Sequence, residues 1–534
     1  MSAYRSAAIH SLGRGAVLSH KLFRSTAIFS AMTLISRVFG YARDMVIAIH
    51  FGADGATDAF FVAFRIPNFL RRLFAEGAFS QAFIPVFTEH KEQRDLAALR
   101  ELLARTSGTL FGILALVTVA GVLGAPLLIL VFAPGFADDP QRFALATDML
   151  RITFPYLLFI SLTALAGGVL NSFGRFAVPA FTPVFLNLSL IGVTLWLAPH
   201  LPEPVIALAI GVLIAGVLQL AFQLPFLYRL RLLPWPRWGH AHEGVRRIMK
   251  LMVPALFGSS VVQINFLFDT LVASFLAAGS ISWLYFSERF MEMPLALFGI
   301  ALGTVILPKL SQHHAREAQA DFAATLDWAM RAATLVAVPA ALGLALLAGP
   351  ILTALIEYRA FNAFDVHMTA LSLIGFSAGL PAYMVLKILA PGFYARQDTS
   401  TPVRVGVIAL LVNMALTIAI VTPWQLLGIP GPHTGLALST SLAAYLNAWL
   451  LYRRLRLDGV YPDPQWGGVL WRALMAGAGM SALLLWLSPP LQQWAAWGLS
   501  ARLLHLAELI VIGGGAYALI LIALGVRARD FIRA

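Results

Sequence analysis

The chain has 534 residues, of which 59% are hydrophobic and 12% are charged. Because soluble domains carry about 25% charged residues, this composition excludes an ordinary soluble enzyme and a disordered chain, and favours a membrane protein. The formal net charge of +12 indicates basic cytoplasmic loops rather than nucleic-acid binding. The absence of Cys excludes disulfides and thiolate-ligated metals.

Turn residues divide the chain into apolar segments, each long enough for a spanning helix of about 20 residues. We therefore predict an all-α polytopic membrane protein with fourteen transmembrane helices. Their expected positions are 25–50, 57–86, 107–132, 146–170, 178–199, 204–227, 251–277, 281–307, 323–350, 367–391, 402–422, 433–452, 469–488 and 503–526.

The loops indicate an orientation. With the N-terminal segment 1–23 placed in the cytoplasm, the inside segments hold 26 of the 38 Lys and Arg residues, whereas the outside segments hold Arg142, Arg359 and Arg502. Since positive charge concentrates on the cytoplasmic side, we predict that both termini are cytoplasmic. Segment 229–250 is then a cytoplasmic linker.

A weak internal repeat divides the chain further. FGADG at 51–55 aligns with FLAAG at 275–279 at an offset of 224, and the same offset places Arg65 on Arg289. We predict two parallel six-helix lobes, 24–228 and 251–456, around a central cavity, as in transporters with a binding site at the midplane. Segment 457–534, with the last two helices, lies outside the repeat.

Charged residues within the predicted spans are the main functional signal. These residues are Arg37, Arg43, Asp44, Asp58, Arg65, Arg71, Arg72, Glu76, Asp269, Glu288, Arg289, Glu292 and Lys387. A charge at the bilayer centre costs about 2.5–3.5 kcal/mol on insertion scales. The charged side chains must therefore line a wet cavity, pair with one another, or bind an ion.

Two interpretations of the arginines remain. In the first they are structural: Arg43 pairs with Asp44 or Asp58, and Arg289 pairs with Glu288 or Glu292. In the second they line an aqueous cavity for a phosphorylated ligand, because the planar guanidinium group binds phosphate oxygens in pairs and stays charged. We favour the second.

Several motifs resemble those of the MurJ (MviN) lipid II flippase family. They are SRVFGYARD at 36–44, ATDAFFVAFR at 56–65, PNFLRRLFAEGAFSQAFIP at 67–85, APGF at 133–136, RFMEMP at 289–294, GTVILP at 303–308 and LAPGFYARQD at 389–398. The resemblance implies the multidrug/oligosaccharidyl-lipid/polysaccharide exporter fold. It also implies export of undecaprenyl-pyrophosphate-linked peptidoglycan precursor, lipid II, across the bacterial cytoplasmic (inner) membrane.

The resemblance also implies roles for single residues. The family's essential cavity arginines fall on Arg37, Arg43, Arg71 and Arg289. Asp44, Asp58, Arg65, Glu76, Glu292 and Lys387 are the expected supporting charges. Helical periodicity alone places Arg72, rather than Arg71, on the charged stripe of its helix. We follow the family because Pro67 makes that periodicity unreliable.

The resemblance also implies a sodium site between the seventh and eleventh spans of some relatives. Asp269 lies at a plausible position for such a site, and Asn413 and Thr417 are four residues apart on one helical face. Oxygen atoms of this kind suit hard cations. The sequence lacks a second carboxylate in the eleventh span, so Asp269 as an ordinary cavity acid is the alternative.

The predicted function is therefore a transporter, not an enzyme, that moves lipid II by alternating access without a resident cofactor other than the candidate sodium ion. Membrane lipids and proteins of cell-wall synthesis or division are the expected partners. Two alternatives remain: another transporter of the same fold, for lipid-linked oligosaccharides or for drugs and cations, and a membrane enzyme acting on polyprenyl-pyrophosphate lipids. Four cavity arginines argue against a drug exporter, and the short outside loops argue against the enzyme.

Overall fold

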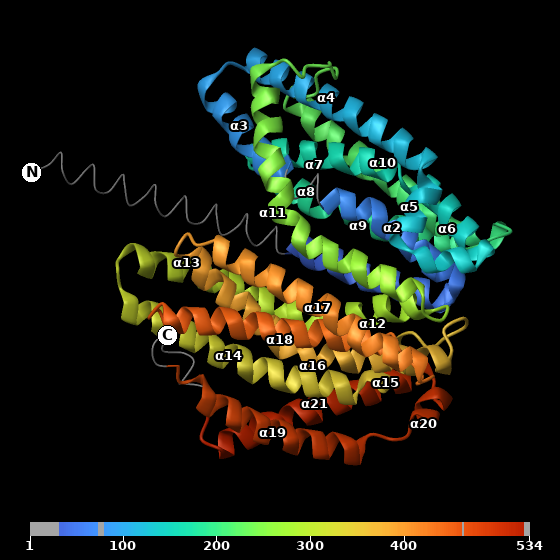
Figure 1. The fold of residues 1–534 in the computed structure, drawn as a ribbon, viewed down its shortest axis with the longest axis vertical. Coiled ribbons are helices and arrows are strands. Elements are labelled where there is room, and N and C mark those ends of the chain that lie inside the picture. The colour runs from blue at the N-terminus through green and yellow to red at the C-terminus, as the bar shows by residue number, and fades with distance from the viewer. Residues whose placement is uncertain (1–30, 73–78, 462–463, 528–534) are drawn as a thin grey trace, which may run out of the picture. The chain divides into compact units, whose positions relative to one another are not determined.

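The computed structural model describes residues 31–72, 79–461 and 464–527. Within these ranges all regular elements are helices, which confirms the predicted all-α class (Figure 1). The chain forms two compact units. Unit 1 contains residues 31–47 together with the described parts of Ala59–Val131 and Asp139–Gln263, and unit 2 contains Ala48–Asp58, Phe132–Asp138 and the described residues from Ile264 onward.

Unit 1 consists of a first helix over residues 31–51, whose last residues belong to unit 2, followed by nine labelled helices and the start of α11. The nine are α2 (Gly55–Arg71), α3 (Ser80–Gln93), α4 (Leu96–Leu123), α5 (Ala125–Phe132), α6 (Pro140–Thr153), α7 (Tyr156–Ser172), α8 (Ala177–Phe181), α9 (Val184–Gly192) and α10 (Ile206–Arg229).

Helix α11 (Glu243–Ser274) belongs to unit 1 as far as Gln263 and to unit 2 from Ile264. The remaining helices belong to unit 2. They are α12 (Ser280–Pro294), α13 (Ile300–Ala315), α14 (Gln319–Leu346), α15 (Ala348–Leu355), α16 (Ala363–Tyr394), α17 (Ser400–Leu426), α18 (Thr434–Leu457), α19 (Trp466–Leu487), α20 (Leu491–Ala496) and α21 (Leu499–Ala523).

Nine helical segments of the described residues are long and apolar enough to cross a membrane. They cover nine of the fourteen predicted spans, so the exact number of spans stays a prediction. The other five are 25–50, 57–86, 251–277, 281–307 and 433–452. The first four contain all the charged residues singled out in the sequence except Lys387, and the fifth is rich in Ser, Thr and Ala. Helices α2 and α12 are 17 and 15 residues long, so short helices as well as charged residues keep spans out of the nine.

Each unit has its own apolar core. In unit 1, Phe83 of α3, Leu103 of α4, Val169 of α7 and Ile248 of α11 belong to one buried cluster. In unit 2, α14, α16 and α18 pack closely, and α19 packs against both α14 and α21 (Figure 1). A separate buried cluster around Trp494 joins the last three helices to α14 and α15.

The buried Arg502, near the start of α21, forms hydrogen bonds with the C-terminal ends of α15 and α20. Its guanidinium group donates to the carbonyl oxygens of Thr353 (2.7 Å), Glu357 (3.1 Å), Ala495 (2.7 Å) and Trp497 (3.0 Å). These carbonyls lie at or just beyond the C-terminal ends of α15 and α20, where helices leave carbonyl groups unsatisfied and carry partial negative charge. Arg502 therefore has a structural role in unit 2.

The linker between α10 and α11 lies directly on α4. The Arg237 backbone N–H donates to the Ala104 carbonyl oxygen (2.8 Å), and the Gly239 N–H donates to Thr109 Oγ1 (3.1 Å). A Cβ atom at Gly108 would lie only 2.3 Å from the Arg237 carbonyl oxygen. Glycine at position 108 therefore permits the close approach of the linker backbone.

Candidate functional site

Arg43 lies in the first helix and is only 6% exposed. Its Nε and Nη2 atoms donate to Asp44 Oδ1, at 2.9 and 2.6 Å. Its Nη1 atom donates to Asn187 Oδ1, at 3.1 Å. A buried charge needs a partner of opposite charge and satisfied hydrogen bonds, and this cluster supplies both. Of the two partners predicted for Arg43, the structure places Asp44 against it.

Asn187 connects two parts of the first helix. While its amide oxygen accepts from Arg43, its Nδ2 atom donates to the Ser36 carbonyl oxygen at 3.0 Å. A Cβ atom at Gly40 would lie 3.7 Å from the same Nδ2 atom, so the amide lies against that face of the helix. The α9 residue Asn187 thus fixes the position of the Arg43 guanidinium group.

The other predicted cations of unit 1 are more accessible. Arg37 is exposed on the first helix, whereas Arg65 and Arg71 are half-buried on α2. Arg71 Nε donates to Asn68 Oδ1 at 2.7 Å, one turn earlier on the same helix. The adjacent Arg72 is also half-buried. Glu76 lies outside the described residues.

Asp58, in the first turn of α2 and part of unit 2, is fully buried, and its carboxylate contacts the start of α12. Its Oδ2 atom accepts from the Gly279 N–H (2.8 Å), and its Oδ1 atom accepts from the Ser282 N–H (2.8 Å) and hydroxyl (2.6 Å). The carboxylate therefore caps the helix N-terminus, where anions are stabilised. Asp58 and Ser282 are 224 residues apart, which is the offset of the internal repeat.

Arg289 and Glu292 are three residues apart on the same face of α12 and form an ion pair. Arg289 Nη1 lies 2.8 Å from Glu292 Oε2, and its guanidinium carbon lies 5.1 Å from the centre of the Tyr285 ring. Both charged side chains are partly exposed, at 33% and 43%. A π-helical segment, Leu295–Gly299, follows directly. Segments of this kind are frequent at functional sites.

Lys387 is exposed on α16. A Cβ atom at Gly303 would lie 2.9 Å from the Lys387 carbonyl oxygen, so glycine permits α13 to approach the backbone of α16 at this residue. The structure thus shows local pairs, Arg43 with Asp44 and Arg289 with Glu292, while Arg37 and Lys387 remain exposed. The assignment of these residues to substrate binding stays a prediction.

The predicted cation site lies within unit 2, on α11 and α17. Asn265 Nδ2 donates to Asp269 Oδ2 (3.2 Å), and Asn413 Nδ2 donates to Asn265 Oδ1 (2.7 Å). Among the described residues, Asn413 Oδ1 and the buried Thr417 Oγ1 have no hydrogen-bond partner. Unsatisfied buried oxygens call for an explanation such as an ion, so the donor set fits a hard cation.

Two polar residues of these clusters were missed by sequence reasoning. Asn187 is a single Asn in an apolar span, 144 residues from Arg43, and no local pattern marks it. Asn265 could have been found, since it precedes Asp269 by four residues and therefore lies on the same helical face. The rule that would find both is to treat each polar residue inside an apolar span as a candidate partner.

Solved structures first show the class of fold. An inward-facing multidrug resistance MATE family transporter of the MOP superfamily matches with a TM-score of 0.62 at 12% identity, covering 82% of this chain and 99% of that one. The structure of the lipid II flippase MurJ in an inward closed conformation matches with a TM-score of 0.78 at 27% identity, covering 95% of this chain and all of that one. The chain therefore has the fold of these membrane exporters.

Sequence comparisons then show the family. The family model "Lipid II flippase MurJ" matches residues 47–505. A probable lipid II flippase MurJ of Vibrio cholerae is 49% identical over 523 residues, covering 96% of this chain and 98% of the relative. The lipid II flippase MurJ of Burkholderia cenocepacia is 44% identical over 470 residues, covering 87% of this chain and 90% of the relative. This chain belongs to the MurJ lipid II flippase family, a family of multi-pass membrane transporters.

Proposed function

We propose that this protein moves lipid II from the inner to the outer leaflet of the bacterial cytoplasmic membrane, with both termini in the cytoplasm. Membership of the MurJ family supports the substrate, and the distribution of Lys and Arg among the loops supports the orientation. The pyrophosphate binds to arginine side chains, while the long polyprenyl tail stays in lipid. Alternating access exposes the charged site to one side of the membrane at a time.

The observation that carries this proposal is the buried Arg43 cluster. Asp44 accepts two N–H groups of Arg43 through one oxygen atom, and a phosphate oxygen can accept the same donors. Pyrophosphate therefore replaces Asp44 as the partner of Arg43, while Asn187 holds the guanidinium group in place. Arg37, Arg71 and Arg289 supply further positive charge.

The membrane potential provides a sufficient driving force. Moving one elementary charge across 100 mV is worth about 2.3 kcal/mol. A headgroup with two negative charges that moves outward across a membrane with an inside-negative potential of about 100 mV therefore gains roughly 4–5 kcal/mol. We expect an ionophore that collapses the potential to slow flipping in proteoliposomes, and unchanged flipping would rule out this drive.

Sodium coupling is a second proposal, which rests on the unpartnered oxygens of Asn413 and Thr417 in the described part of unit 2. These oxygens and the Asp269 carboxylate would hold a sodium ion. Bound sodium supplies a positive charge and a second gradient. The test is a sodium-dependent shift in melting temperature of the purified protein, with potassium as the control; equal shifts for both ions would rule the site out.

The function is tested by depleting the native flippase in cells and asking on which leaflet labelled precursor accumulates. Wild-type protein should restore labelled precursor to the outer leaflet. Arg289→Glu should leave it on the inner leaflet, although the protein inserts normally. The matched control is Arg404→Glu, a charge reversal at an exposed arginine of α17. Full activity of Arg289→Glu would contradict the arginine model.

A further inference from the structure

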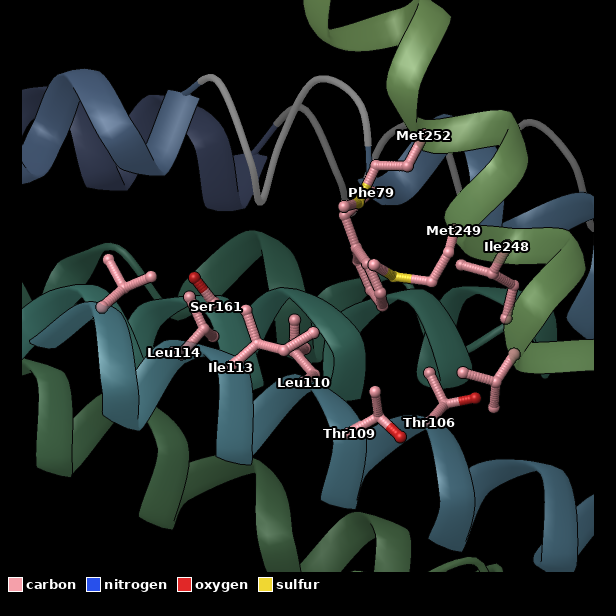
Figure 2. A pocket seen from close by; sticks show the side chains of 12 residues that line it. Phe79, Thr106, Thr109, Leu110, Ile113, Leu114, Ser161, Ile248, Met249 and Met252 are labelled. Carbon is pink, nitrogen blue, oxygen red and sulfur yellow. The ribbon is translucent and has the colours of Figure 1, made fainter. Parts of the chain in front are cut away.

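Unit 1 contains a cavity of about 80 Å³ that the proposed transport mechanism does not use. Side chains of α4, α7 and α11 line it together with Phe79 (Figure 2). A single water molecule needs about 10–15 Å³ by the same measure, so the cavity has room for several methylene groups. Its lining is almost entirely apolar, and apolar cavities of this size bind apolar groups rather than water.

Two hydroxyl groups distinguish this cavity from a simple packing defect. Thr106 on α4 is 3% exposed and Ser161 on α7 is 2% exposed, and both line the cavity. Their hydroxyl oxygens have no hydrogen-bond partner among the described residues. An unsatisfied buried hydroxyl is unfavourable. A ligand that fits the cavity should therefore carry hydrogen-bond acceptors, such as ester carbonyl groups, as well as an apolar chain.

Two exposed basic residues lie next to lining residues of the cavity on α11. Arg246 and Lys250 directly follow the lining residues Val245 and Met249 on α11, and both are exposed. The linker on α4 carries Trp235, which is 86% exposed. Exposed Trp and basic side chains beside spanning helices typically mark the headgroup region. In the proposed orientation this is the cytoplasmic leaflet, which carries negative charge.

We propose that this cavity binds one acyl chain of an anionic glycerophospholipid from the cytoplasmic leaflet. The chain lies between α4 and α11, an ester carbonyl group accepts from Thr106, and the phosphate contacts Arg246 and Lys250. The lipid packs against the part of α11 that belongs to unit 1 and stabilises its contact with α4. None of the arginine residues proposed to bind the pyrophosphate lines this cavity.

The test uses the full-length protein in liposomes that contain phosphatidylglycerol with a photoreactive group midway along one acyl chain. Peptide mass spectrometry should locate the label on residues 106–117 of α4 and 245–252 of α11. Ile113→Trp, which fills the cavity, should reduce this labelling about tenfold, the loss expected when about two methylene groups lose their burial. The control Leu116→Trp places the same bulk on the lipid-facing side of α4, where Leu116 is 72% exposed, and should label normally.

Two further comparisons test the polar contacts. Thr106→Val keeps the side-chain volume and should weaken labelling without unfolding the protein. Arg246→Ala with Lys250→Ala should remove the preference for phosphatidylglycerol over phosphatidylcholine, roughly fivefold for each basic residue. The exposed arginines Arg316 and Arg404 of unit 2 provide the matched double-alanine control.

Three outcomes would overturn the proposal. One is equal labelling of wild-type protein and correctly folded Ile113→Trp. The second is labelling confined to the outward side of α4 around Leu116. The third is displacement of the label by a small excess of undecaprenyl phosphate, which would assign the cavity to the substrate's tail. Since the readout is lipid labelling, failure here leaves the proposed transport function intact.

Discussion

Two buried arginines, one in each unit, have different kinds of partner. Arg502 is 5% exposed and donates to four backbone carbonyl oxygens near helix ends. Arg43 is 6% exposed but donates to two side chains, Asp44 and Asn187. Backbone carbonyls at helix ends are fixed, whereas a carboxylate partner can be exchanged for a ligand oxygen. Burial alone therefore does not indicate the role of an arginine. An arginine bonded to backbone carbonyls is expected to be structural, whereas one bonded to side chains can exchange a partner for a ligand.

The largest effect should follow charge reversal at Arg43. Arg43→Glu places two carboxylates together and removes the phosphate-binding group, so we expect complete loss of flipping. The milder Arg43→Lys keeps the charge but loses the planar fork of donors, and flipping should fall about tenfold or more. Both variants are checked by precursor accumulation with insertion measured separately. If Arg43→Glu flipped lipid II at the wild-type rate, Arg43 would not have a binding role that distinguishes it from Arg502.

Arg502→Leu should act on stability. It leaves carbonyl oxygens at two helix ends without a donor, which should destabilise unit 2 by on the order of 2–4 kcal/mol. The melting temperature should fall, while flipping per folded molecule at low temperature stays near the wild-type rate. A specific loss of flipping at unchanged melting temperature would contradict the structural role.

Substitutions at Asn187 should give intermediate effects. Asn187→Ala removes one hydrogen bond to Arg43, so flipping should fall roughly fivefold to tenfold. Asn187→Asp adds a second negative charge beside Arg43; it should keep or raise the melting temperature but slow flipping more than Ala does. Opposite ranking of the two variants in the flipping assay would show that Asn187 does not act through Arg43.

The smallest effect concerns the candidate cation site. Thr417→Val removes one unpartnered oxygen while keeping the side-chain volume. Stabilisation by sodium is about 0.4 kcal/mol when its concentration equals Kd, and this variant should lose it. The measurement is the melting temperature in sodium against potassium. A sodium-dependent shift retained by Thr417→Val would exclude Thr417 as a ligand.

Local sequence patterns predicted a large part of this molecule. Apolar segments predicted the all-helical class, and motifs such as SRVFGYARD at 36–44 predicted the family. The residues of the pairs Arg43–Asp44 and Arg289–Glu292 are one and three positions apart, so both ion pairs could be predicted from the sequence as possible pairings. These features are encoded within a few turns of helix.

Long-range contacts were not predictable in the same way. Asn187 meets Arg43, and Asp58 caps α12, through pairings that are 144 and more than 200 residues apart. The four carbonyl partners of Arg502 belong to the backbone, which carries no residue-specific signal. Four of the five predicted spans outside the nine contain candidate charges, and residues 25–30 and 73–78 of two of them lie outside the described part of the chain, so the helix count stays a prediction.

The most direct test is the affinity of the purified protein for undecaprenyl pyrophosphate when the Arg43 pair is made neutral. Arg43→Gln combined with Asp44→Asn removes both charges together and avoids leaving one buried charge unpaired. We predict binding at least about tenfold weaker than wild type, the equivalent of one hydrogen bond to a charged group, with normal binding by Arg404→Gln. Wild-type affinity in the neutral pair would contradict the assignment of Arg43 to pyrophosphate binding.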